Sequence, residues 1–466
     1  MTGAGALAPQ DVIERVLALA AARDTVGCVV LVSETGEAAL RWANSTMTTN
    51  GLTTSRQVTV IALVAVEGGV AAGTVVSGTT VTDAAQLGDL VDAARAAARD
   101  AGPARDAAPL PEPGGDDPGW GEPAAEATIA VFGGVAEGLA EVLAGPYRHY
   151  GFAHHELETT WLGTSTGVRR RWVQPTGSVE LNVKTPDLER SAWTGMSTVD
   201  FTDVDLVSLA AEAARRTEWG ARKVELPAGR YETVLPPSAV ADLMTYLAWS
   251  MDGRPAQEGR SALAGPDGPR VGERLTDLPL TLASDPFLPG LEYEPFLTAT
   301  RSGDGISVFD NGAPTRRAEW VRAGVINELV YSRAEAAEFG TAFTPPAGNL
   351  VLTGGSEAST ADLVSRTERG LLLTCLWYIR EVDPTTLLLT GLTRDGVYLV
   401  ERGEVVAEVG HNFRFNYSPL DVLRRGSEVG ATERTVPREW KDWFTRTAMP
   451  TVRVPEFTMS SVSLGR

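Results

Sequence analysis

Histidines with neighbouring carboxylates are the side chains of this sequence that could most directly bind a metal or transfer protons. The stretch His154-His155-Glu156, with Glu158 two residues later, brings imidazole and carboxylate groups together. Adjacent residues of a strand point to opposite faces, so His154, Glu156 and Glu158 can share one side, whereas His155 cannot join them. The chain contains neither H-x-x-x-H nor H-E-x-x-H. We therefore interpret the stretch as a partly paired, solvated strand edge and predict no metal ligands in it.

Ser165 lies in Gly163-Thr164-Ser165-Thr166-Gly167, which matches the G-x-S-x-G motif of a nucleophile elbow. An elbow requires a helix directly after the motif, because the strained strand-to-helix turn exposes the serine. Here the next residues, 169–173, are strand-like, and only His411 could act as a downstream base. We interpret the motif as a turn between strands.

Composition and charge exclude several classes of function. Lys plus Arg total 41 and Asp plus Glu total 60, and the resulting net charge of −19 repels nucleic acid and anionic membrane surfaces. The two cysteines, Cys28 and Cys375, are too far apart in the sequence to indicate a disulfide framework or a zinc knuckle. The start of the chain does not resemble a signal peptide, and no apolar run reaches the roughly 20 residues of a membrane span. We expect a cytoplasmic protein with no nucleic-acid or membrane partner.

The elements that must position these residues alternate between helices and strands in the first half of the chain. Helices are predicted at 9–22, 83–100, 129–143 and 204–216, and antiparallel strands at 28–32, 38–42, 58–66, 158–162, 169–174 and 178–183. Turn signals lie at 34–36, 49–51, 163, 167 and 177. Residues 102–126 are rich in proline, glycine and acids, which favours an extended, mobile surface segment.

The second half is dominated by short strands. A strand at 231–235 precedes a helix at 238–251, and later helices are expected only near 333–339 and 361–366. The length of 466 residues suits two or three domains. The predicted fold class is α+β, with an α/β N-terminal domain over residues 1–235 that contains the insertion 102–126. A strand-rich, barrel or sandwich-like C-terminal domain follows over residues 236–466.

Several stretches along nearly the whole chain, taken together, resemble the TldD/PmbA family of peptidases. They include Tyr150-Gly151-Phe152-Ala153, Gln174-Pro175-Thr176-Gly177, Tyr231-Glu232-Thr233-Val234-Leu235-Pro236-Pro237, Asp310-Asn311-Gly312-Ala313-Pro314 and Asn412-Phe413-Arg414-Phe415-Asn416-Tyr417-Ser418-Pro419. The resemblance implies a two-domain protein that works in a dimer to degrade or trim peptides.

The same resemblance reveals one departure from the family pattern. In the catalytic branch, the helix that corresponds to residues 238–251 carries H-E-x-x-x-H, and a cysteine near the C-terminus completes a zinc site. Here that helix has neither histidine nor glutamate, the polar outlets in its first turns are Asp242, Thr245 and Tyr246, and no cysteine follows Cys375. A catalytic zinc needs three or four ligands and a base for its water. The chain is thus similar to the PmbA (TldE) branch, which implies no catalytic residue, metal or cofactor of its own and a zinc-bearing, TldD-like catalytic partner.

One function and two alternatives follow. We expect a non-catalytic TldE/PmbA-like subunit of a heterodimeric zinc metallopeptidase that degrades or trims unfolded or leader peptides. It would help to form a peptide channel in which an extended peptide adds to an exposed strand edge. The candidate contacts, which alternate along one strand face, are Asn412, Arg414, Asn416 and Ser418. The alternatives are a stand-alone peptidase or hydrolase that uses His154, His155 and Glu156 or Ser165, and a homodimeric peptide-binding protein.

Overall fold

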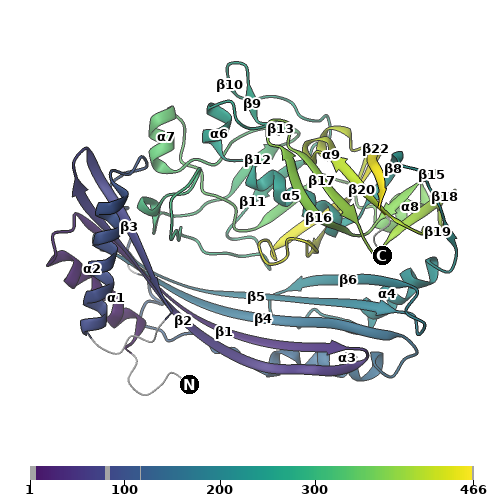
Figure 1. Ribbon diagram of the computed structural model, residues 1–466, viewed down its shortest axis with the longest axis horizontal. Coiled ribbons are helices and arrows are strands. Elements are labelled where there is room, and N and C mark those ends of the chain that lie inside the picture. The colour runs from purple at the N-terminus through teal and green to yellow at the C-terminus, as the bar shows by residue number, and fades with distance from the viewer. Residues whose placement is uncertain (1–6, 79–83, 116, 464–466) are drawn as a thin grey trace.

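A long, curved antiparallel sheet forms the N-terminal part of the computed structural model, which describes residues 7–78, 84–115 and 117–463 (Figure 1). Its strand order is β3-β2-β1-β4-β5-β6. The strands are β1 (Gly27–Ala43), β2 (Thr46–Val66), β3 (Gly69–Ser77), β4 (Arg148–Thr164), β5 (Arg169–Lys184) and β6 (Ser191–Thr198). One face of the sheet carries helices, and the other faces the C-terminal domain.

The helices cover their face of the sheet in two groups. α1 (Pro9–Ala21) and α2 (Ala84–Ala101) lie at one end, and the 3₁₀ helix η1 (Ile129–Phe132), α3 (Gly133–Val142) and α4 (Leu206–Trp219) lie at the other. Val12 and Val16 of α1 are buried in one cluster with Trp161 of β4, because helical spacing places them on one stripe. The start predicted for the second helix, Asp83, and the first six residues of the chain lie outside the described residues.

The strands are longer than the sequence predicted. β1 and β2 run through the turns expected at 34–36 and 49–51, and β5 runs through the one expected at 177, so these three predictions are wrong. Pairing on both sides of β1 overrides the local signal, since Gly36 pairs with Thr54 of β2 and with Leu157 of β4. The hairpin turn falls instead at Asn44 and Ser45, whose φ angles of 50° and 58° are left-handed.

The insertion at residues 102–126 has no helix or strand among its described residues, yet it is held against the sheet. Leu110 is buried in a cluster with residues of β1 and β2. The Asp117 carboxylate accepts the N–H of Arg171 at 2.7 Å, and the Thr166 hydroxyl donates to the Pro111 carbonyl at 2.6 Å. These contacts hold in place a segment that composition alone predicted to be extended and mobile.

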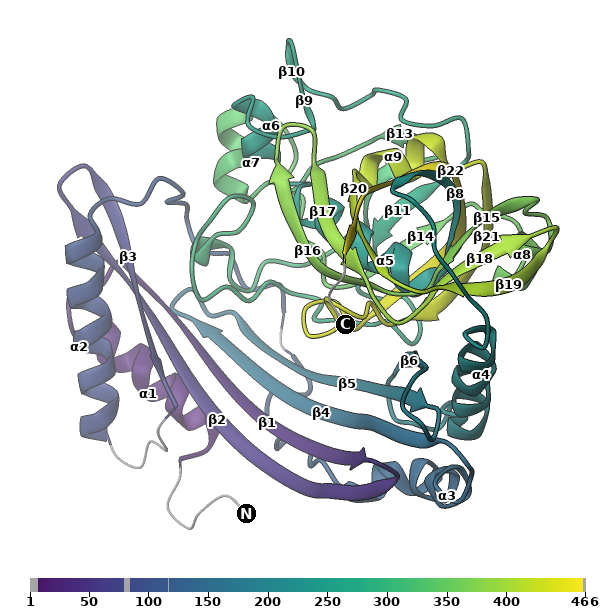
Figure 2. The same ribbon diagram turned by 45° about the vertical axis from the view of Figure 1, so that its right-hand side comes forward.

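A strand-rich domain follows, and its strands curve around the helix α5 (Pro237–Trp249), as Figure 2 shows. The main strand order is β13-β12-β11-β14-β22-β8-β15-β18-β19-β7; β20 and β21 attach to β22, β17 to β20, and β16 to β17. The strands are β7 (Lys223–Val224), β8 (Gly229–Leu235), β11 (Thr281–Ser284), β12 (Ala318–Arg322), β13 (Val325–Ile326), β14 (Leu350–Thr353), β15 (Arg369–Leu373), β16 (Leu376–Asp383), β17 (Leu388–Thr393), β18 (Val397–Glu401), β19 (Glu404–Val409), β20 (Asn412–Tyr417), β21 (Glu428–Thr435) and β22 (Thr447–Ser463). The sheet therefore includes β7 and β8, which precede the boundary expected at residue 236.

Short elements complete the C-terminal domain. They are the helices α6 (Gly253–Gln257), η2 (Val308–Asp310), α7 (Arg333–Phe339), α8 (Thr360–Ser365) and α9 (Pro419–Arg425), and the two-stranded β9 (Ala264–Gly265) and β10 (Gly268–Pro269). The predicted α+β fold class is confirmed, with large sheets in both halves. No helix in the described ranges combines the length and apolar character that a bilayer crossing requires.

Candidate functional site

Helix α5, at the position where the family resemblance implies a zinc motif, is enclosed by protein. Every residue from Ala239 to Ala248 is buried. Pro237 at its first position fits the helix, because a proline has no N–H to leave unpaired there. The Thr245 hydroxyl donates to the Ala241 carbonyl at 2.9 Å, and the Tyr246 hydroxyl donates to the Ile379 carbonyl at 2.7 Å. Both hydroxyl groups thus donate their hydrogen bonds to main-chain carbonyl groups.

Asp242 of α5 holds the segment that joins β21 to β22. Its carboxylate accepts the backbone N–H groups of Glu439 at 2.9 Å and of Arg438 and Trp440 at 3.3 Å each. Burial raises the pKa of Asp242 well above the usual value, and the three N–H donors oppose this shift because they favour the ionised form. The carboxylate therefore acts as a cap for a connecting segment of the domain.

Arg438, in the segment that Asp242 holds, is half-buried, and its side chain makes contacts of its own. The Arg438 guanidinium donates to the Cys375 sulfur and, at 3.4 Å, to the Asp395 carboxylate, and it stacks over the rings of Trp193 and Trp377 at 5.4 Å each. Burial raises the pKa of the Cys375 thiol to about 12, so the thiolate that binds metals is disfavoured. This confirms Cys375 as a buried core residue with a guanidinium beside it.

The predicted peptide contacts Asn412, Arg414 and Asn416 lie on β20. The predicted alternation of their side chains with buried ones along that strand is confirmed. Phe413, Phe415 and Tyr417 are buried, and Arg414 is exposed. However, β20 pairs with β17 over residues 414–417 and with β22 over residues 412–415, so both of its sides are paired at Arg414 and Phe415. Ser418 is buried, and its hydroxyl donates to the Thr386 carbonyl at 3.1 Å. The channel role of these residues stays a prediction, and at Arg414 β20 could contribute only a side chain to it.

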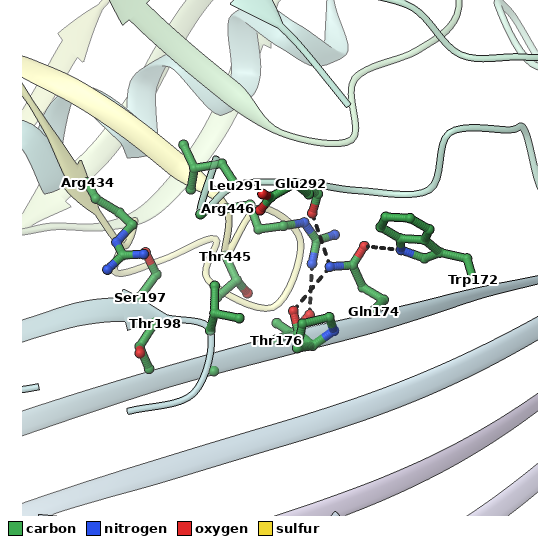
Figure 3. A pocket seen from close by; sticks show the side chains of 14 residues that line it. Trp172, Gln174, Thr176, Ser197, Thr198, Leu291, Glu292, Arg434, Thr445 and Arg446 are labelled. Atoms are coloured by element: carbon green, nitrogen blue, oxygen red, sulfur yellow. Dashed lines mark hydrogen bonds between the residues drawn. The ribbon is translucent and has the colours of Figure 1, made fainter. Parts of the chain in front are cut away.

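A pocket lies where the two domains meet, and Figure 3 shows its side chains. Its volume is about 380 Å³, including the part open to solvent. β5 and the end of β6 form its floor, and residues of the C-terminal domain form its roof. The labelled lining residues are Trp172, Gln174, Thr176, Ser197, Thr198, Leu291, Glu292, Arg434, Thr445 and Arg446.

Polar contacts cross the domain boundary at this pocket. The Gln174 amide donates to the Glu292 carbonyl at 3.1 Å, and the Trp172 indole donates to Gln174 at 3.0 Å. Arg446 donates to the Thr176 hydroxyl at 2.8 Å. These groups give the pocket amide, hydroxyl and guanidinium functions, which are the functions that can bind an extended peptide.

Three carboxylates surround Arg446 behind the pocket. Glu156 and Glu158 belong to β4, and Glu294 belongs to the loop after β11. Burial, with Glu158 nearby, raises the pKa of Glu294 to about 7, although Thr298 donates a hydrogen bond to its carboxylate at 2.8 Å. Burial raises the pKa of Glu156, and Glu158 and Glu37 add to the shift, whereas Arg446 opposes it. The interface is therefore rich in carboxyl groups, two of which ionise at a higher pH than usual.

The histidine stretch lies within the sheet and not at its edge, because β4 pairs with both β1 and β5; the predicted strand edge is wrong. As the alternation predicted, His155 faces the helix-covered side, where its Nε2 lies 3.0 Å from the Val199 carbonyl, and its burial lowers its pKa. His154 faces the C-terminal domain with Glu156 and Glu158. Its Nε2 lies 3.9 Å from an oxygen of Glu37 on β1.

Ser165 lies in the turn between β4 and β5, as predicted. Its hydroxyl oxygen accepts the N–H of Cys28 at 3.0 Å, and a strand follows where a nucleophile elbow needs a helix. His411, the only candidate base downstream, has its Nδ1 2.6 Å from a carboxylate oxygen of Glu225. The structure therefore does not bring together the parts of a serine hydrolase site.

Sequence reasoning missed the residues of the domain interface. Gln174 and Thr176 belong to a stretch that resembles the family, but no contact was predicted for them. Neither Arg446 nor Glu294 was predicted to have a role. That resemblance was the available signal, because the stretch Gln174-Pro175-Thr176-Gly177 lines the pocket. Arg446 reaches Thr176 across 270 positions of sequence, a distance over which local patterns carry no information.

The architecture described above, a long antiparallel sheet joined to a strand-rich domain around one helix, defines a two-part α+β protein. Residues 125–220 match the family model described as the PmbA/TldA metallopeptidase central domain, and residues 228–461 match the one described as its C-terminal domain. The chain belongs to the PmbA/TldD family. A comparison with curated proteins gives no match.

Three solved structures share the whole fold. TldE from Thermococcus kodakarensis is 16% identical and superimposes with a TM-score of 0.78, covering 96% of this chain and 99% of its own. A Thermotoga maritima protein described as a candidate modulator of a DNA gyrase is 16% identical, with a TM-score of 0.74 and the same coverage. A Bacteroides thetaiotaomicron protein described as a candidate modulator of DNA gyrase is 14% identical, with a TM-score of 0.75 over 97% of this chain and 98% of its own. At these identities the likeness concerns the fold alone.

Proposed function

We propose that this chain is a non-catalytic TldE/PmbA-like subunit of a cytoplasmic, heterodimeric zinc metallopeptidase that degrades or trims unfolded or leader peptides. The observation that carries the proposal is that the polar side chains of α5 already have protein partners. Its one carboxylate, Asp242, is engaged by three backbone N–H groups. A zinc ion would require further ligands, and the hydroxyls of Thr245 and Tyr246 are bound to carbonyl groups.

The pocket at the domain interface supports the peptide-binding part of the proposal. It combines amide and guanidinium groups with the end of β6, the last strand of the N-terminal sheet. An edge strand can accept an extended peptide through main-chain hydrogen bonds. In this proposal the TldD-like partner supplies the zinc and its water, and this chain supplies the second wall of the channel.

Reconstitution with a partner tests the proposal. The purified chain, an H-E-x-x-x-H-bearing family member from the same genome, and their mixture are assayed for cleavage of an unfolded protein and of a leader-bearing peptide. We expect cleavage by the mixture and none by this chain alone, with a partner variant whose motif glutamate is replaced by glutamine as the inactive control. Chelator-sensitive cleavage by this chain alone would overturn the proposal in favour of a stand-alone enzyme. Peptide binding by a stable homodimer that does not associate with the partner would favour the other alternative, a homodimeric peptide-binding protein.

A further inference from the structure

A second group of metal-type ligands lies on the N-terminal sheet, far in sequence from α5. One ligand atom from each of Glu37, His154 and Glu156 lies within 4.8 Å of the other two. In the β1–β4 register Glu37 is directly opposite Glu156, and His154 precedes Glu156 by two positions on the same face. Two residues at i and i+2 and a third across the ladder form the most compact triangle that one face of a sheet can present.

Neighbouring side chains orient two of the three ligands. The Thr53 hydroxyl donates to a Glu37 carboxylate oxygen at 3.3 Å. The Phe152 ring stacks on the His154 imidazole, with centroids 5.7 Å apart and planes 18° apart. Contacts of this kind fix ligand rotamers before a metal arrives and so reduce the entropy lost on binding. All three ligand residues are half-buried, so their charges are screened less than those of surface residues.

The local charge favours a cation. Glu158 lies near this triangle and adds to its two carboxylates, and Arg446 is the cation whose charge acts on Glu156. Three carboxylates against one guanidinium leave an excess of negative charge between the domains. A divalent ion would offset this excess, because a bound cation is commonly the largest local charge in such a site.

We propose that Glu37, His154 and Glu156 bind one divalent transition-metal ion of the zinc class. One imidazole nitrogen with two carboxylates suits Zn²⁺ or Co²⁺, whereas Ca²⁺ and Mg²⁺ prefer oxygen ligands only. Three protein ligands leave a coordination position for water or for an oxygen of a bound molecule. The site is separate from α5 and does not depend on the proposed role of the chain as a peptidase subunit.

Metal titration of the full chain tests this site. The protein is dialysed against a chelator and then against metal-free buffer, and it is titrated with Zn²⁺ by calorimetry and with Co²⁺ by visible absorption. We expect one equivalent to bind, with a Co²⁺ spectrum free of thiolate charge transfer because both cysteines lie elsewhere and are buried. His154→Ala and Glu156→Gln should each weaken binding more than about 100-fold, beyond the loss typical when a residue that only supports a metal ligand is replaced.

Matched variants distinguish direct binding of the metal ion by a side chain from its attraction to the surrounding negative charge. His411→Ala removes the other close His–carboxylate pair, with Glu225, and should leave the affinity unchanged. Glu158→Gln removes a neighbouring charge but no ligand, and should weaken binding less than tenfold. Glu37→Gln, at a side chain that is 45% exposed, provides a ligand variant with little risk to folding, which circular dichroism checks. Absence of binding to the wild-type chain, or equal binding by His154→Ala, would overturn the proposal.

Discussion

Asp242 accepts the backbone N–H of Glu439 at 2.9 Å, and this contact ties the central helix of the C-terminal domain to the segment before β22. The segment continues to Arg446, which donates to Thr176 on the N-terminal sheet. The helix position at which the family resemblance implies zinc ligands is thus connected to the domain interface. A structural role for the carboxylate follows from this geometry.

Replacement of Asp242 by alanine should destabilise the chain strongly. The change leaves three part-buried N–H groups without their acceptor, and each should cost about 1 kcal/mol, the low end of the range for an unsatisfied group. We expect a loss of about 3 kcal/mol or more in the free energy of unfolding, measured by urea titration. Thr245→Val is the control, because it removes one hydrogen bond within the helix and should cost about 1 kcal/mol. Equal, small losses in both variants would contradict the capping role.

The free energy of unfolding should fall as the pH rises from about 4.5 to above 7, in part because of Glu294. Its pKa is raised from 4.5 to about 7 in the folded chain, so its contribution is fully present below the unfolded pKa and is lost as the pH passes the folded value. Glu294→Gln keeps the shape and removes the titration. At pH 8 this variant should be more stable than the wild type, by at most about 3 kcal/mol, and the advantage should vanish near pH 4. Parallel stability curves for the two proteins would exclude Glu294 as a source of the pH dependence.

The amphipathic elements could be predicted from the sequence, and the long-range pairings could not. Val12 and Val16 lie on a stripe that periodicity reveals, so α1 was expected almost to the residue. Gly36 carries a turn signal that the two-sided pairing of β1 overrides. A turn at this position would have kept Glu37 from pairing with Glu156. The register of β1 against β4 also joins segments more than a hundred residues apart, so the sequence did not indicate this pairing. The sequence therefore placed His154 and Glu156 on one face of a strand, but it could not place Glu37 beside them.

Neither cysteine should react with a thiol reagent in the folded chain. Burial raises the pKa of Cys28 and of Cys375 to about 12 each, so almost no thiolate is present at neutral pH. Titration with Ellman's reagent at pH 7.5 should show no fast reaction, and two thiols per chain should react in concentrated guanidinium. Rapid labelling of one native cysteine, located by mass spectrometry, would mean that the segment covering it opens readily.

Arg414→Ala should reduce partner-dependent cleavage several-fold with little loss of stability. The side chain is exposed on β20 between the buried Phe413 and Phe415, and surface substitutions of this kind usually change the free energy of unfolding by less than about 0.5 kcal/mol. Arg369→Ala is the matched control, because Arg369 is an exposed arginine on another strand, β15, of the same sheet. The measurement is the kcat/KM of the reconstituted pair for an unfolded peptide.

The comparison with Arg446 decides which surface the peptide follows. At Arg414 the main chain of β20 is paired with both β17 and β22, so at this position only the side chain can contact a peptide. Arg446 instead lies at the interface pocket beside Thr176. If Arg414→Ala leaves cleavage unchanged while Arg446→Lys, which keeps the charge, raises KM, the peptide binds between the domains and the β20 contacts are structural. Loss of cleavage in Arg414→Ala but not in Arg369→Ala would instead place the channel along β20.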